Sequence, residues 1–184
     1  MSPILGARGG LAASAYGFTS TVAALPGDYD SIASVTLSSA NSVTFSSIPQ
    51  DYKHLQIRGI SNAGSWIQLV INSTTSANYS RHELRGSGSS ASADGNGNGD
   101  LIFALGGGST YPTAFIMDVF DYTSTNKYKT TRALYGSDQN GSGYVGLTSG
   151  AYLANLNAVT SLTFYSYALS NLASGTTIAL YGVK

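Results

Sequence analysis

The sequence has no cysteine and very little charge. Its 184 residues include 9 Lys and Arg against 9 Asp and Glu, so charged residues make up 10% of the chain and the formal net charge is zero. The lack of cysteine excludes disulfides and thiolate chemistry. The lack of a basic excess argues against nucleic-acid binding, which leaves a basic stripe as its usual footprint. We therefore expect no nucleic-acid partner.

Long apolar runs and helical patterns are also missing. No run approaches the roughly 18 apolar residues of a membrane span, so we expect no membrane insertion. Glu83 is the only glutamate, which argues against long amphipathic helices rich in Glu and Lys. Scarce charge gives copies little mutual repulsion, and low net charge favours association. Either Ser, Thr, Asn and Gly keep the domain in solution, or other subunits cover much of its surface.

From about residue 31 the chain consists of short β-type runs separated by Gly, Ser and Asn. Leu55 and Ile57 alternate with polar residues, and Trp66 and Gln68 alternate with apolar ones. Strands at such regular spacing predict an all-β antiparallel sandwich or barrel of about ten strands. The expected strands are 31–38, 42–48, 53–60, 65–71, 78–86, 100–106, 113–121, 127–136, 144–149, 158–168 and 177–184. We expect 31–38 and 42–48 to form a hairpin and 86–100 to be a surface loop.

Residues 1–28 differ from the β-domain at 29–184. They are rich in Gly, Ala and Ser, and glycines interrupt every helical pattern. A secretory signal is one interpretation, but Gly9-Gly10 breaks the apolar stretch that such a signal needs. We expect an extended anchoring arm, because disordered tails carry fewer large apolar side chains. The arm residues expected to dock are Ile4, Leu5, Leu11, Tyr16 and Phe18.

Catalytic and metal-binding motifs are not formed. Ser–His–acid chemistry would need His54 or His82, and no local pattern supports either. Gly86 stands where a zinc-binding HExxH helix would place its second histidine after His82. The run GNGNGD at 95–100 leads into an apparent strand and not into the helix of a phosphate site. We expect no enzyme activity, cofactor or metal.

Two aspartates on one expected strand suggest a glycosidase pair. A spacing of three residues sends Asp118 and Asp121 to opposite faces of a strand. In a hairpin centred near Thr125, Asp118 instead falls opposite Arg132, and Asp121 opposite Lys129. The prediction is a pair of cross-strand ion pairs, each contributing under about 1 kcal/mol.

Three stretches carry a family resemblance: YKHLQIRGI at 52–60, NKYKTTRALYG at 126–136 and TTIALYGVK at 176–184. They are similar to small β-rich structural proteins of tailed bacteriophages, and the early segment SPILGARGG resembles the leading anchor of such proteins. The resemblance implies a jelly-roll-like β-sandwich in a virion, commonly as a homotrimer among other virion proteins. Tail-fibre or baseplate attachment and capsid decoration are both compatible with it.

A different function class is suggested by the 13 tyrosines. Tyr, Ser, Gly and Asn build adaptable recognition surfaces, and aromatic faces suit sugars. A carbohydrate-binding receptor module, with a host surface glycan bound at loops near 86–99, 106–112 and 136–143, is therefore the alternative. On 159–167, Tyr165 and Tyr167 are expected to share one face of a strand.

Overall fold

A computed structural model describes residues 27–62, 66–75, 78–97, 102–105, 111–138, 140–167 and 171–184. These residues form twelve β-strands and no helix, which confirms the all-β prediction. The strands are β1 (Tyr29–Thr36), β2 (Ser42–Phe45), β3 (His54–Ser61), β4 (Ile67–Ile71), β5 (Tyr79–Gly86), β6 (Ala91–Gly97), β7 (Ile102–Leu105), β8 (Thr113–Phe120), β9 (Lys129–Asp138), β10 (Gly143–Tyr152), β11 (Leu162–Ser166) and β12 (Thr177–Val183).

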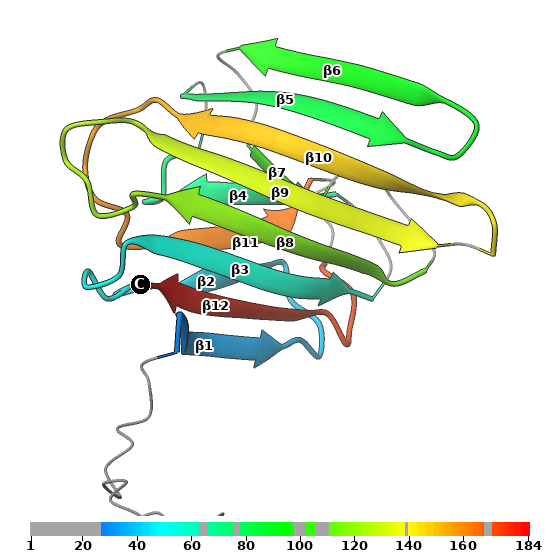
Figure 1. The fold of residues 1–184 in the computed structure, drawn as a ribbon. Helices are drawn as coiled ribbons and strands as arrows, with labels where there is room; N and C mark the ends of the chain where they lie inside the picture. Colours follow the sequence, from blue (N-terminus) through cyan, green and yellow to red (C-terminus); the bar gives the residue numbers. More distant parts are fainter. Residues whose placement is uncertain are drawn as a thin grey trace, which may run out of the picture.

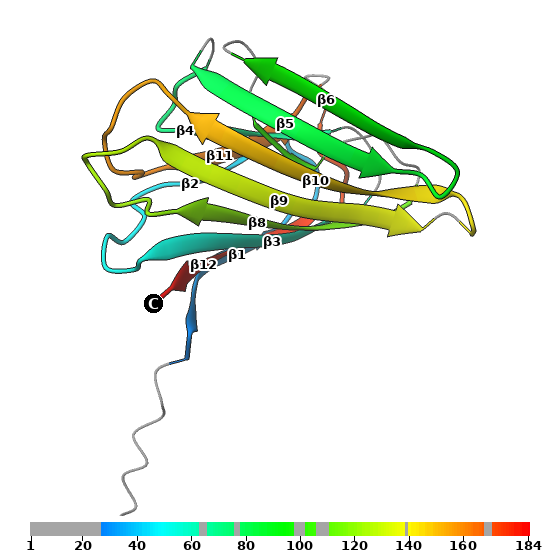
Figure 2. The same ribbon diagram turned by 45° about the horizontal axis from the view of Figure 1, so that its top comes forward.

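The strands form two antiparallel sheets packed face to face. The large sheet has the order β1-β12-β3-β8-β9-β10-β5-β6, and the small sheet has the order β2-β11-β4-β7. The small sheet lies behind the large one in Figure 1, and the turned view in Figure 2 separates the two layers. This arrangement is the predicted β-sandwich, with one sheet twice as wide as the other.

The topology is that of a jelly roll with two added hairpins. Strand β1 pairs with β12 in the large sheet while β2 pairs with β11 in the small one, and β3–β8 and β4–β7 repeat this relation. Such nested pairing, with consecutive strands in opposite sheets, is the double Greek key of a jelly roll. The hairpins β5–β6 and β9–β10 both extend the large sheet beyond β8 (Figure 1).

The core lies between the sheets and follows the alternation in the sequence. Leu55 and Ile57 of β3 are fully buried, and Leu69 and Ile71 of β4 face them from the small sheet. Phe164 of β11 also packs edge to face against Phe45 of the neighbouring strand β2, with ring centroids 6.3 Å apart. Because most side chains on the two inner faces are apolar, burial of this surface drives the two layers together.

The predicted hairpin of 31–38 with 42–48 is wrong. The chain crosses from the large sheet to the small one between β1 and β2, so these strands never pair. Leu37 is buried at the crossing, where its N–H donates to the carbonyl of Thr176 at 2.9 Å and its carbonyl accepts from the N–H of Gly175 at 2.8 Å. The connector therefore bonds to the segment before β12 and not to a hairpin partner.

The expectation of a loop across 86–100 is also wrong for most of its length. Residues 91–97 form β6, the edge strand of the large sheet, with Glu83 opposite Asp94. This strand lacks the apolar side chains that mark a buried strand, and all of its residues except the half-buried Asn96 are exposed. Backbone hydrogen bonds to β5 suffice at an edge, since a ladder needs only N–H and C=O groups.

Candidate interaction surface

A row of aliphatic side chains crosses the outer face of the large sheet. Ile116 of β8 lies opposite Leu134 of β9, which lies opposite Leu147 of β10, which lies opposite Leu84 of β5. These four residues, here called the apolar row, are 42–57% exposed. Directly opposed residues in a sheet have their Cβ atoms about 5 Å apart, so the row is continuous. Exposed aliphatic residues are usually scattered singly, and a contiguous patch indicates an interaction site.

The adjacent row enlarges this surface. Val145 and Ile60 are 58% and 53% exposed, and with the apolar row they make up the apolar face. Between them in register lie Ala114 and Gly136, while Gly86 lies on the far side of Val145. The two glycines leave shallow apolar hollows on either side of the valine. The apolar face is thus a ridge flanked by grooves, a shape into which another surface can interlock.

Beyond the apolar row, toward the other end of the strands, the same face is polar. Asp118 lies opposite Arg132, whose Nη2 donates to its Oδ2 at 3.2 Å, in the register that the sequence predicts. Gln56 on the neighbouring strand donates to the other oxygen, Oδ1, at 2.9 Å. The carboxylate therefore has partners on both adjacent strands. The outer face of the large sheet is divided into an apolar half and a hydrogen-bonded polar half.

The predicted pairing of Asp121 with Lys129 is wrong. Asp121 leaves the strand with φ 46°, forms an ion pair with Lys127 and donates its N–H to Nδ1 of His54 at 2.9 Å. The hydrogen bond from Lys127 lowers the pKa of the Asp121 carboxyl. Lys129 is fully buried, and its ammonium donates to three backbone carbonyls in the turns around it, those of residues 124, 127 and 156, at 2.6, 2.9 and 3.1 Å. Burial lowers its pKa.

The candidate catalytic and metal-binding side chains of β5 point to opposite faces of the sheet. His82 is exposed on the outer face, whereas Glu83 is buried on the inner face, where it accepts a hydrogen bond from the hydroxyl of Tyr135. Arg81 lies 3.6 Å and Arg85 4.0 Å from the glutamate. Glu83 thus belongs to an ionic cluster under the β5 strand. Within the ranges that the structure describes, no three His, Asp or Glu side chains gather as metal ligands would.

Other predicted site residues fall in several places. Ile4, Leu5, Leu11, Tyr16 and Phe18 lie outside the described residues, as do 106–110 of the tyrosine-bearing loops. Of the loop near 86–99, residues 91–97 are strand β6, whereas the loop near 136–143 contains the end of β9, the turn at 140–142 and the first residue of β10. Sequence reasoning missed the apolar face altogether. Its residues come from five strands, and only the register between those strands brings them together.

Comparison of the chain with models of protein families, with curated proteins and with solved structures finds no match in any of the three. In the described part of the chain, no helix has the length and apolarity that crossing a membrane requires. The function is therefore inferred from the surface of the sandwich, above all from the apolar face.

Proposed function

We propose that this chain is a structural subunit of a tailed-bacteriophage virion, most simply a tail-fibre or baseplate subunit. Its sandwich associates with copies of itself through the apolar face, and residues 1–28 anchor it to other virion proteins. The observation that carries the proposal is the apolar row, an uninterrupted line of exposed aliphatic side chains across four adjacent strands. The sequence resemblance supplies the virion context.

The size of the apolar face supports a second copy as its occupant. Its six large side chains are each about half exposed, so covering them contributes roughly 1 kcal/mol apiece, or roughly 6 kcal/mol per chain. Two copies that cover each other's face gain about twice that amount. Association costs an estimated 4–15 kcal/mol, so the roughly 12 kcal/mol from paired faces covers most of that range and the roughly 6 kcal/mol from a single face covers only its lower end. The zero net charge adds no repulsion between copies.

The test uses two substitutions on one strand. Leu134→Asp places a charge in the middle of the apolar row, whereas Thr130→Asp places the same charge on the same outer face, outside the apolar face. Sedimentation velocity should show a homo-oligomer for the wild type and for Thr130→Asp. Leu134→Asp should sediment as a folded monomer. A monomeric wild type at high micromolar concentration, or an unchanged Leu134→Asp variant, would contradict self-association.

The anchoring arm and the place in the particle need separate experiments. Deleting residues 1–28 should abolish incorporation into particles while leaving the sandwich folded, and unchanged incorporation would remove the arm from the proposal. Capsid decoration is the alternative location, and it would use the same apolar face. Cryo-EM of intact particles distinguishes the two, because density for the sandwich on the shell would replace the tail assignment.

A further inference from the structure

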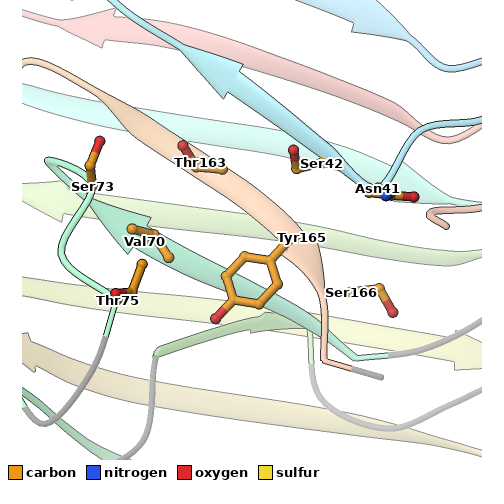
Figure 3. Close-up of a pocket in the computed structure, with 8 residues that line it drawn as sticks. All are labelled: Asn41, Ser42, Val70, Ser73, Thr75, Thr163, Tyr165 and Ser166. Atoms are coloured by element: carbon orange, nitrogen blue, oxygen red, sulfur yellow. The ribbon is translucent and has the colours of Figure 1, made fainter. Parts of the chain in front are cut away.

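The outer face of the small sheet carries a hollow of about 640 Å³, at the opposite side of the sandwich from the apolar face. Small-molecule sites in proteins usually span about 300–1,000 Å³. Figure 3 shows the ring of Tyr165 beside Val70 at its centre, with Ser73 and Thr75 on the turn at one side. The remaining lining residues are Asn41, Ser42, Thr163 and Ser166. The hollow therefore has an apolar floor and hydroxyl-bearing walls.

The lining chemistry restricts what can bind. None of the eight lining residues is charged, so an anion or an ammonium group would find no counter-charge there. Hydroxyl and carboxamide groups both donate and accept hydrogen bonds, which suits a ligand that also does both. A wholly apolar ligand would desolvate these groups without replacing their hydrogen bonds. A neutral ligand with one apolar face and a rim of hydroxyls satisfies every part of the hollow.

The wall formed by the turn after β4 is built rigidly. Asn72 and Ser73 both have positive φ, 50° and 59°, a conformation that non-glycine residues seldom adopt. The Asn72 carboxamide holds the turn, because Nδ2 donates to the carbonyl of Ala158 at 2.8 Å and Oδ1 accepts from the N–H of Thr160 at 2.8 Å. Such backbone strain persists where surrounding contacts impose it, and it concentrates at functional sites.

Beneath the turn, two buried tyrosines fix Thr74. The hydroxyl of Tyr79 donates to the carbonyl of Thr74 at 2.8 Å, and the hydroxyl of Tyr152 lies 2.9 Å from Oγ1 of the same residue. Ser73 and Thr75, on either side of Thr74, are thereby presented to the hollow from a fixed backbone. A wall positioned in advance loses less conformational freedom when a ligand binds.

We infer that this hollow binds a neutral pyranose sugar. The C–H face of the sugar ring packs on Tyr165 and Val70, and its hydroxyl groups exchange hydrogen bonds with the Ser, Thr and Asn walls. The site is separate from the apolar face, so it remains open when the sandwich self-associates. This binding function is independent of the proposed structural role, and either can fail without the other.

Saturation-transfer NMR tests the inference with the methyl glycosides of glucose, galactose and mannose and with N-acetylglucosamine, each at millimolar concentration. At least one should receive saturation on its ring protons. Tyr165→Ala should weaken binding at least about fivefold, the loss expected for one ring-packing contact, whereas Tyr165→Phe, which keeps the ring, should bind nearly as the wild type does. Tyr128→Ala, which removes an exposed tyrosine from the β8–β9 turn, is the control and should change nothing.

Mapping of amide chemical shifts on the wild-type protein tests the same site even if Tyr165→Ala is destabilised. In the wild type, the sugar should shift the amides of Ser42, Ser73 and Thr163 and leave that of Tyr128 unmoved. The inference is overturned if none of the four sugars binds, if the shifts map elsewhere, or if Tyr128→Ala weakens binding as much as Tyr165→Ala does. Stronger binding of sialic acid or glucose 6-phosphate than of every neutral sugar would also overturn it, because the lining offers no cation.

Discussion

Replacing Tyr79 by phenylalanine removes a single oxygen atom from the core, yet that oxygen joins two elements. Tyr79 is fully buried on β5, with its ring 5.3 Å from that of Tyr152. Its hydroxyl accepts the N–H of Ile71 at 2.9 Å and donates to the carbonyl of Thr74 at 2.8 Å. Among the described residues the ladder between β4 and β7 runs from Ile67 to Leu69, and the hydroxyl bonds to the chain beyond that point.

The free-energy cost of Tyr79→Phe follows from the groups it leaves behind. The N–H of Ile71 and the carbonyl of Thr74 would both lose a partner, and a buried polar group without one costs about 1–3 kcal/mol. The ring and its packing remain, so the loss of apolar burial is small. We therefore expect the free energy of unfolding at pH 7 to fall by about 2–6 kcal/mol, measured by urea denaturation followed by circular dichroism.

The pH dependence gives a second, signed expectation. Burial raises the pKa of the Tyr79 hydroxyl above its ordinary value, so the folded chain keeps this proton at a pH where the unfolded chain has lost it. Below about pH 10 both states are protonated and the group adds no pH dependence. Above that pH the unfolded state is favoured, and the wild type loses about 1.4 kcal/mol per pH unit through this tyrosine. Tyr79→Phe lacks that loss.

The stability gap between wild type and Tyr79→Phe should therefore be constant from pH 7 to 9 and shrink by about 1.4 kcal/mol at pH 11. Tyr135→Phe provides a comparison, because burial raises the pKa of Tyr135 as well. A gap below about 0.5 kcal/mol at pH 7 would mean that the two backbone groups find other partners. A gap that grows with alkaline pH would refute the assignment of the buried hydroxyl.

Three further expectations concern the sheets. Gly146→Ala should lower the unfolding free energy by about 1–3 kcal/mol in urea denaturation, because its Cβ would overlap the buried ring of Tyr135, whereas Gly86→Ala, in open space, should cost little. Asp118→Ala should cost under about 1 kcal/mol by the same assay, since its guanidinium partner is 60% exposed; a larger loss would mean that the pair is more than a surface contact. Removing 177–184 takes the strand between β1 and β3 out of the large sheet, so calorimetry should show no cooperative unfolding transition, and a retained transition would contradict its central place.

The sequence was sufficient for the faces of individual strands. Alternation placed Leu55 and Ile57 inside and Gln56 outside, and the structure confirms each. On β11 the same alternation is observed, with Leu162 and Phe164 buried and Thr163 and Tyr165 half-buried between them. Such patterns are reliable because successive side chains on a strand must point to opposite faces.

The pairing and register of strands that lie far apart in the sequence could not be predicted in this way. Leu84 and Leu147 lie opposite each other although more than sixty residues of chain separate them, and no local pattern encodes that register. Lys129 was misassigned because alternation and charge suggested an exposed ion pair, whereas its three acceptors are backbone carbonyls that carry no signal in the sequence. The residues of the apolar face and of the hollow on the small sheet are likewise brought together by pairing between distant strands.

The pairing of β1 with β12 has a consequence for how the protein is made. The hydroxyls of Thr36 and Thr177 lie 3.2 Å apart in the finished sheet but 141 residues apart along the chain. A ribosome adding about 5–20 residues per second needs roughly 7–28 seconds between these two strands. Throughout that interval β1 lacks the strand with which it pairs in the sheet, and an unpaired strand edge can pair with another chain. Slower translation should therefore increase the yield of strand-exchanged aggregates relative to correctly closed sandwiches.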